Sequence, residues 1–277
     1  AAAVRGSKAV HLSEAVEAQA APWKRLWKVG QEAFDVASLP LDTVLPFAMP
    51  SPDQLRATIA TYSWHTSVGA DHWAPRHIGL LSDHLLISLV EIYELHIRAA
   101  LMPSRWQLLH IYLIPKGEAD VRPIGVFATL VRIIDRFVRR MYISSWLQSL
   151  DGSPHYGTRG RSVEQAVWTS AVVAEYSACA GRHSSAFMLD ISKAFEHVEH
   201  KVLAEAARAH GFSTMLVAWL IRMYQMSRVV SFQDALSEAV EATVSVVPGS
   251  SHADVAMKLL LLTPIEGCRG HFPTVKL

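Results

Sequence analysis

The residue best placed to do chemistry is Asp190, which stands between a short apolar run and a segment with helical spacing. Residues 186–189 (A-F-M-L) are too few for a helix and predict a buried strand. Behind Asp190, apolar residues recur at helical spacing as far as Gly211; they are Phe195, Val198, Val202, Leu203, Ala206 and Ala209. A carboxylate beside so much apolar surface is costly unless it is paired or holds a cation. The alternative is that Asp190 caps the helix.

The residues that follow, D-I-S-K-A-F-E, resemble the first catalytic motif of reverse transcriptases of non-long-terminal-repeat (LINE-type) retrotransposons. The resemblance implies that Asp190 is a catalytic, metal-binding carboxylate of the palm. It also implies that Phe195 is the aromatic gate that crowds a ribose 2′-hydroxyl and so favours deoxynucleotides. The last Asp of the family's motif is Glu196 here, which keeps the charge and adds a methylene.

A second block is similar to the fingers hairpin of the same enzymes. Residues 108–114 predict a strand that ends in Pro115-Lys116, and a polar turn leads to the segment V-R-P-I, which contains Arg122. The resemblance implies that Lys116 and Arg122 meet the triphosphate of the incoming nucleotide. A polyanion about to lose pyrophosphate needs fixed positive charge on a rigid element. The alternative is two solvated charges beside a turn.

The segment 129–142 has the clearest helical pattern in the chain, with apolar residues along one side. The opposite side carries four arginines, Arg132, Arg136, Arg139 and Arg140. Four arginines with only Asp135 nearby favour contact with a phosphate backbone over a merely solvated face. We therefore expect this side to bind the template.

Two glycine-containing segments complete the resemblance. The segment Y-G-T-R-G-R-S, with Arg159 and Arg161, is similar to the loop that helps to hold the template, and Ser162 can cap the next helix. Gly249 matches the glycine of the second palm motif, which lies under the nascent base pair. Pro248 stands where the family usually has Gln.

The other segments predict a helix over 12–39 broken at Pro22, a capping box at Ser51 and a helix starting at Ser82. After residue 215 they predict a helix over 216–226, a hairpin of strands 228–232 and 242–247, and a helix over 253–262. Most of the chain, from Trp64 to Leu262, follows the family's order of blocks.

The composition limits the cellular compartment that we expect but does not indicate a function. The chain has 277 residues, 51% hydrophobic, with 26 Lys plus Arg against 25 Asp plus Glu, so net charge alone gives no case for nucleic acid. Cys179 and Cys268 form no disulfide framework or metal-ligand spacing, which favours a reducing compartment and no disulfide-linked partner. No run of 18 apolar residues and no secretory signal is present. We expect no membrane contact and an intracellular location, in nucleus or cytoplasm.

We therefore expect an α+β protein, helix-rich with short antiparallel strands, arranged as right-hand polymerase fingers and a partial palm. The expected parts are an N-terminal helical lead-in (1–62), a fingers-like region (63–180) and a partial palm without a thumb (181–277). The implied activity is RNA-directed DNA polymerisation with two Mg²⁺ ions, acting on an RNA template, a DNA primer and a dNTP.

One part of the family's pattern does not appear. The remaining metal-binding carboxylates of the family lie in an aromatic-x-Asp-Asp hairpin, but no Asp follows Asp254 and the only later acid is Glu266. We expect a domain truncated before that motif, without measurable polymerase activity. The alternative is a non-catalytic RNA-binding protein that keeps the fold; an Asp-Asp pair encoded just beyond Leu277 would favour the enzyme.

Overall fold

The computed structural model describes residues 11–28, 32–116, 120–150, 162–183, 185 and 190–271. The predicted strand over 186–189 and the residues Arg159 and Arg161 lie outside this part of the chain.

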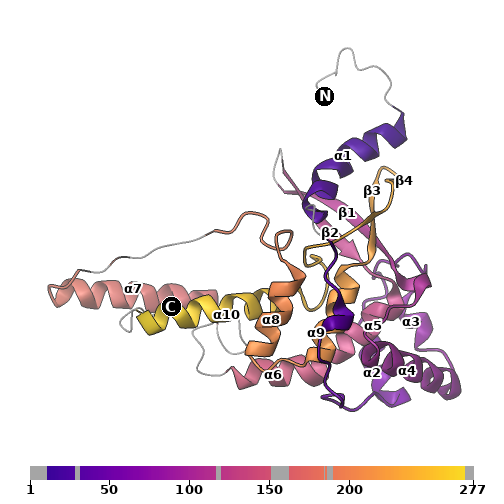
Figure 1. Cartoon of the computed structure of the whole chain (residues 1–277), viewed down its shortest axis with the longest axis horizontal. Helices are drawn as coiled ribbons and strands as arrows, with labels where there is room; N and C mark the ends of the chain where they lie inside the picture. The colour runs from indigo at the N-terminus through magenta and orange to yellow at the C-terminus, as the bar shows by residue number, and fades with distance from the viewer. Residues whose placement is uncertain are drawn as a thin grey trace.

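A small mixed sheet brings together strands from two distant parts of the chain (Figure 1). β1 (Leu108–Lys116) and β2 (Asp120–Val126) form an antiparallel hairpin, and β3 (Ser227–Phe232) lies parallel to β1 along its other edge. β4 (Ala235–Leu236) and β5 (Val240–Glu241) both pair with β3. The predicted hairpin is confirmed, whereas the expectation of antiparallel strands alone is wrong because β1 and β3 are parallel.

Helices make up most of the rest of the described chain. The first half carries α1 (Leu12–Trp27), α2 (Pro52–Ala60), α3 (Pro75–Ile78), α4 (Asp83–Arg98), α5 (Thr129–Val138) and α6 (Ser144–Ser149), with short 3-10 turns η1 (Val36–Ser38) and η2 (Ser104–Trp106) and a π turn η3 (Arg139–Ile143). The second half carries α7 (Val163–Cys179), α8 (His200–Ala209), α9 (Thr214–Tyr224) and α10 (Ala253–His271). The chain is thus mixed α/β, which agrees with the expected class at that level. The three-part division stays a prediction.

Helix starts follow their local sequence signals. Ser51 Oγ accepts a hydrogen bond from Gln54 N at 3.3 Å, and Gln54 Oε1 accepts one from Ser51 N at 3.0 Å, which is the predicted capping box of α2. Ser82 caps α4, and Ser162 caps α7. These caps need only neighbouring residues, so the sequence alone identifies them.

The N-terminal helix differs from its prediction. Pro22 lies inside α1 and does not break it, because Trp23 and Trp27 bury their rings and this packing offsets the hydrogen bond that proline removes. The helix ends at Trp27, and among the described residues from 32 to Leu39 the short turn η1 is the one helical segment.

The helix behind Asp190 starts later than its apolar spacing predicts. Residues 192–197 form turns, and α8 begins at His200. The carbonyls of Phe195 and Val198 accept hydrogen bonds from Val246 N at 2.8 Å and Ser245 N at 2.7 Å. The bonds that would continue a helix upstream are therefore replaced by bonds to a distant segment.

That distant segment is the predicted strand 242–247, and this prediction is wrong as well. The strand β5 consists only of Val240 and Glu241, while the following residues are mostly buried without regular pairing. Their N–H groups bond to two different segments: Thr243 N and Val244 N donate to Trp27 O at 2.9 and 3.4 Å, whereas Ser245 N and Val246 N donate to the Phe195 loop. The apolar, β-branched residues of this segment are therefore explained by its burial and not by regular pairing in a sheet.

α9 is the most buried helix of the second half, and α7 is the most exposed. α9 has nine buried residues among its eleven and packs against α8, which in turn packs against α10. α10 continues past its expected end at Leu262 with Pro264 inside it.

α7 has no buried residue and extends away from the rest of the described chain (Figure 1). No helix in the described residues is long and apolar enough to cross a bilayer.

Candidate nucleotide and template site

The β1–β2 hairpin places its two predicted cations on one face. Ile114 lies opposite Arg122, and Lys116 lies opposite Asp120. Because alternate residues of a strand point to the same side, Lys116 and Arg122 share a face. The strands therefore hold two positive charges near the end of the hairpin, as the resemblance implies.

The turn that contains Gly249 packs directly against β2. Gly125 N donates a hydrogen bond to Pro248 O at 2.6 Å, and Gly249 has a φ of +108°. A Cβ on Gly249 would collide with the carbonyl oxygen of Gly125. Only glycine fits this backbone conformation and this close approach. The predicted glycine is thus joined to the strand that carries Arg122.

Gly249→Ala is therefore expected to destabilise the chain by about 2 kcal/mol more than a matched control, through backbone strain and overpacking against β2. The control is Gly211→Ala, because Gly211 also has a positive φ (+64°) but a Cβ added there would meet no other atom within 4 Å. Urea unfolding of both variants measures the difference. Equal losses of unfolding free energy in the two variants would show that the close contact with Gly125 does not contribute to the cost.

The loop that carries Phe195 lies against the residues just before this turn. Its carbonyl accepts the hydrogen bond from Val246 N, and its ring is half-buried against the core. The Phe195 loop, the turn and β2 are thus connected through one chain of backbone contacts. Val247 packs on the face of β2 toward which Gly125 points, and the side chain of Arg122 lies on the other face.

Asp190 lies five residues before Phe195 and is exposed. An exposed carboxylate is a ligand that Mg²⁺ accepts. Among the described residues, however, no group of three or more His, Cys, Asp or Glu side chains converges. The described residues alone therefore do not complete a two-metal site around Asp190.

Glu196, the departure from the family's motif, is buried. It is 4% exposed, and burial raises its pKa, while the positive charge of Arg228 acts against that shift. Arg228 is itself fully buried and donates to Ser245 Oγ at 2.6 Å and to Tyr224 O at 2.7 Å. Burial lowers the pKa of Arg228 to about 9. Glu196 thus faces the core, and the turn of 192–197 places it there without the helix that its spacing suggested.

Three of the four arginines predicted to bind the template, which lie on α5 and η3, make contacts within the chain. Arg132 donates to Ser67 O at 2.6 Å, and the guanidinium of Arg136 lies 3.5 Å from the ring centroid of Tyr62. Arg139 binds both carboxylate oxygens of Asp254, at 2.6 and 2.9 Å. Arg140 is the exposed member of the four. Replacing all four would therefore disturb packing as well as any contact with a template.

The sequence reasoning missed a buried network that fixes the start of α10. Asp135 is 2% exposed, and its carboxylate accepts from Ser251 N at 3.1 Å, contacts Ser251 Oγ, and pairs with Nδ1 of the fully buried His252. Arg139 adds a hydrogen bond to Ser251 O. The sequence could have indicated that Asp135 is buried, because its position in the helical repeat places it on the same side as the buried Val131 and Val138.

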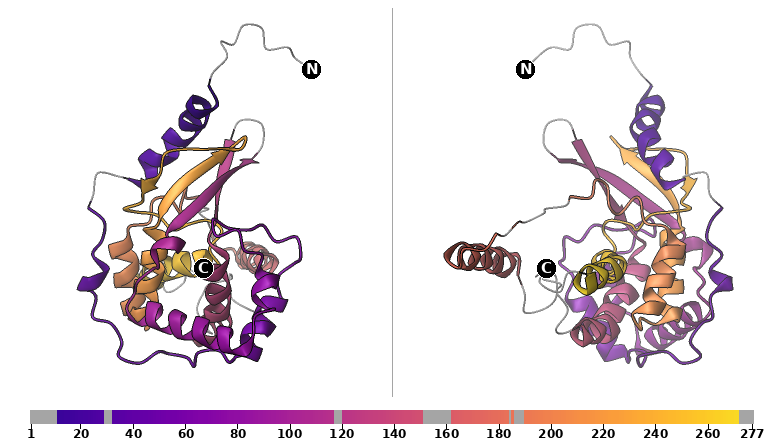
Figure 2. Two further views of the ribbon diagram at one scale, coloured as in Figure 1. Left: turned by 90° about the vertical axis from the view of Figure 1, so that its right-hand side faces the viewer. Right: turned by 60° about the vertical axis from the view of Figure 1, so that its left-hand side comes forward.

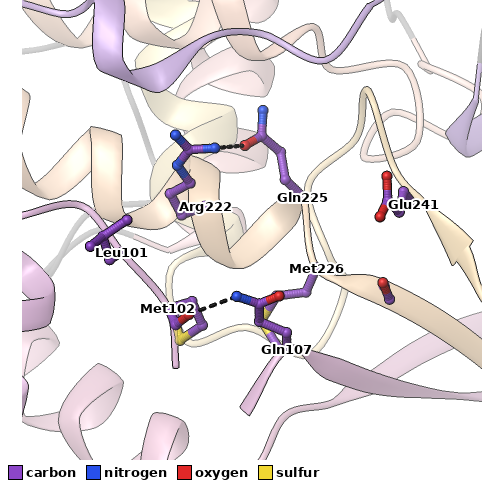
Figure 3. A pocket seen from close by; sticks show the side chains of 8 residues that line it. Leu101, Met102, Gln107, Arg222, Gln225, Met226 and Glu241 are labelled. Atoms are coloured by element: carbon purple, nitrogen blue, oxygen red, sulfur yellow. Dashed lines mark hydrogen bonds between the residues drawn. The ribbon is translucent and has the colours of Figure 1, made fainter. Parts of the chain in front are cut away.

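A separate pocket of about 280 Å³ lies beside the end of α9 (Figure 3). It is lined by Leu101, Met102, Gln107, Arg222, Gln225, Met226, Ser227 and Glu241. Arg222 bonds to Gln225 at 3.4 Å, and Gln107 donates to Met102 O at 2.7 Å, as the dashed lines in Figure 3 show. None of the predicted site residues lines this pocket.

Comparison with known proteins adds no family to this geometry. No family model matches the sequence, and no curated protein matches it significantly.

Proposed function

We propose that the chain is the fingers and palm portion of an RNA-directed DNA polymerase of the retrotransposon type. The observation that carries the proposal is the contact path from the Phe195 loop through the Gly249 turn to β2. The resemblance assigns these three segments, far apart in the sequence, to one nucleotide site. Their contiguity supports that assignment.

Each segment has a role in this proposal. Lys116 and Arg122 hold the triphosphate of the incoming nucleotide, because fixed cations stabilise the charge that develops on the leaving pyrophosphate. The turn at Gly249 supports the nascent base pair, and the ring of Phe195 excludes a ribose 2′-hydroxyl. Asp190 would hold Mg²⁺, which would supply positive charge beside the reacting phosphate.

A non-catalytic RNA-binding protein with the same fold is the second candidate. The burial of Glu196 beside Arg228 favours it, since the acid that replaces the family's Asp faces the core instead of the site. The two candidates differ in whether a dNTP affects binding of the nucleic acid.

A labelled RNA template with a chain-terminated DNA primer tests this difference by fluorescence anisotropy in Mg²⁺. If the proposal holds, the dNTP that matches the template should tighten the complex by about 5- to 150-fold, the usual range for coupled ligands. Replacing both Lys116 and Arg122 with Gln should remove this effect. Phe195→Ala should let the matching ribonucleotide act as the dNTP does.

Arg140→Gln serves as the control in that experiment. Its exposed side chain would contact phosphate only, so the variant should weaken the complex without dNTP and leave the dNTP effect unchanged. Binding that no dNTP alters would favour the RNA-binding protein. In primer extension with Mg²⁺ and then Mn²⁺ we expect no product from this chain, since no group of three or more metal-ligating side chains gathers among the described residues. Extension that Asp190→Asn abolishes would contradict that expectation.

A further inference from the structure

One face of the β1–β2 hairpin exposes aromatic and apolar side chains to solvent. The register places Tyr112 opposite Ile124 and Ile114 opposite Arg122, so these four side chains share a face. Tyr112 is 40% exposed and Ile114 is 50% exposed. We call this the outer face of the sheet; large apolar groups gathered on one exposed face indicate an interaction site.

The helices cover the opposite face. The inner face buries Leu109 and Ile111, and the register places Leu109 beside Arg228, whose guanidinium lies 5.0 Å from the Trp27 ring of α1. Val247 packs on this inner side as well, against Gly125. The left view of Figure 2 looks onto the strands, and no helix crosses them in that view.

A rigid loop, residues 69–73, continues the outer face with a tryptophan. The charge of His72 reaches His110 of β1, whose pKa is lowered by burial and by this neighbour. His110 is in register with Val126 and shares the outer face with Tyr112. Trp73, the next residue in the loop, is 48% exposed. The backbone of Trp73 is bonded to Thr129, just beyond the end of β2, so Trp73 lies near the end of the outer face where His110 and Val126 pair.

Several contacts fix this loop, so Trp73 is held in place before any ligand arrives. Thr129 Oγ1 donates to Trp73 O at 2.5 Å, and Asp71 accepts from Leu130 N at 3.2 Å. Gly69 lies so close to the backbone at Phe127 that a Cβ would collide with its carbonyl oxygen. An aromatic side chain on a fixed backbone loses little entropy on binding.

The charges of this surface select its ligand. Lys116 and Arg122 lie at the end of the hairpin, on the same face as Tyr112 and Ile114. From His110 to Lys116 the strand spans about 20 Å. Exposed aromatic rings on a sheet, with cations beside them, fit unpaired bases joined by phosphates. A purely apolar partner would leave the cations without counter-charges.

We propose that the outer face, with Tyr112 and Trp73 as stacking residues, binds the bases of a single-stranded RNA. Identifying that strand as the template ahead of the nucleotide site rests on the proposed function. The stacking itself does not depend on polymerase chemistry.

Alanine variants with matched controls test the proposal by anisotropy with a single-stranded RNA. Tyr112→Ala and Trp73→Ala should each weaken binding by about 5- to 150-fold, the range for loss of one stacked base. The controls are Tyr176→Ala and Trp168→Ala on α7, which are 66% and 71% exposed and lie far from the sheet (Figure 1). They should bind as the unsubstituted chain does, and Tyr112→Phe should retain the affinity.

An RNA strand with abasic sites separates stacking from charge attraction, because it keeps the phosphates and lacks the bases. The unsubstituted chain should bind it more weakly than the intact strand, and Tyr112→Ala should reduce that difference. If Trp73→Ala fails to fold, this comparison at Tyr112 decides alone.

Equal affinity for both strands, or equal losses in the α7 controls, would overturn the stacking proposal. A dNTP effect that survives in Tyr112→Ala with unchanged RNA affinity would overturn it while leaving the polymerase proposal intact. Loss of RNA affinity in Tyr112→Ala, without any dNTP effect in the unsubstituted chain, would do the reverse.

Discussion

Asp135→Ala is expected to lower the free energy of unfolding by about 3–5 kcal/mol, the usual cost of removing one partner from a buried charged network. The carboxylate is almost fully enclosed and serves Ser251 N, Ser251 Oγ and His252 Nδ1. Without it, these buried donors lose their acceptor and cannot reach water. The start of α10 would then lose its attachment to α5.

Urea unfolding, with Asp254→Ala as the control, measures this loss. Asp254 links α10 to the adjoining turn η3, through Arg139, but its side chain is 47% exposed, so its removal should cost at most about 1 kcal/mol. A double variant, Asp135→Leu with His252→Phe, should lose less than the sum of its single changes, because neither the carboxylate nor the imidazole is then left in the core without the other. Similar losses for Asp135→Ala and Asp254→Ala would contradict the network.

The stability of the chain is expected to fall by about 3 kcal/mol as the pH falls from 6.5 to 4, because of His200. Burial, together with the charge of Arg228, lowers the pKa of His200 to about 4, against the opposing effect of its hydrogen bond to Ser245. Its Nε2 bonds to Ser245 O at 2.9 Å, while its buried Nδ1 has no partner among the described residues. In this pH window the unfolded chain binds a proton that the folded chain does not. Acid therefore favours unfolding.

Denaturant unfolding at several pH values tests this effect. His200→Gln should reduce the slope of stability against pH between 4 and 6.5, whatever its effect at neutral pH. His197→Gln is the matched control, since His197 is three residues earlier and exposed. A slope that is unchanged in His200→Gln would mean that other groups cause the acid sensitivity.

The parts of the fold that the sequence predicts are those with local causes. The capping boxes at Ser51 and Ser162 and the β1–β2 hairpin need only residues within a few positions of one another. The late start of α8 could not be predicted in this way. It depends on hydrogen bonds from Ser245 and Val246, which the spacing of apolar residues does not reveal.

In the candidate site, too, the sequence predicts the features with local causes and not those that depend on tertiary contacts. Gly249 could be placed at a turn from its sequence context, but the reason for glycine there is the backbone of Gly125, which only tertiary structure brings close. The arginines of α5 could be placed on one side of a helix. Their partners Tyr62 and Asp254 lie on other elements, so spacing alone could not distinguish a free surface from an occupied one.

The parallel pairing of β1 with β3 has a consequence for synthesis of the chain. The hairpin is complete once β2 leaves the ribosome, but Leu108 of β1 finds its partner only when Ser227 has been made. At ordinary translation rates this delay is on the order of 10 s. Throughout it, the far edge of β1 has no β3 to pair with its N–H and C=O groups, which makes this edge a route to co-translational aggregation.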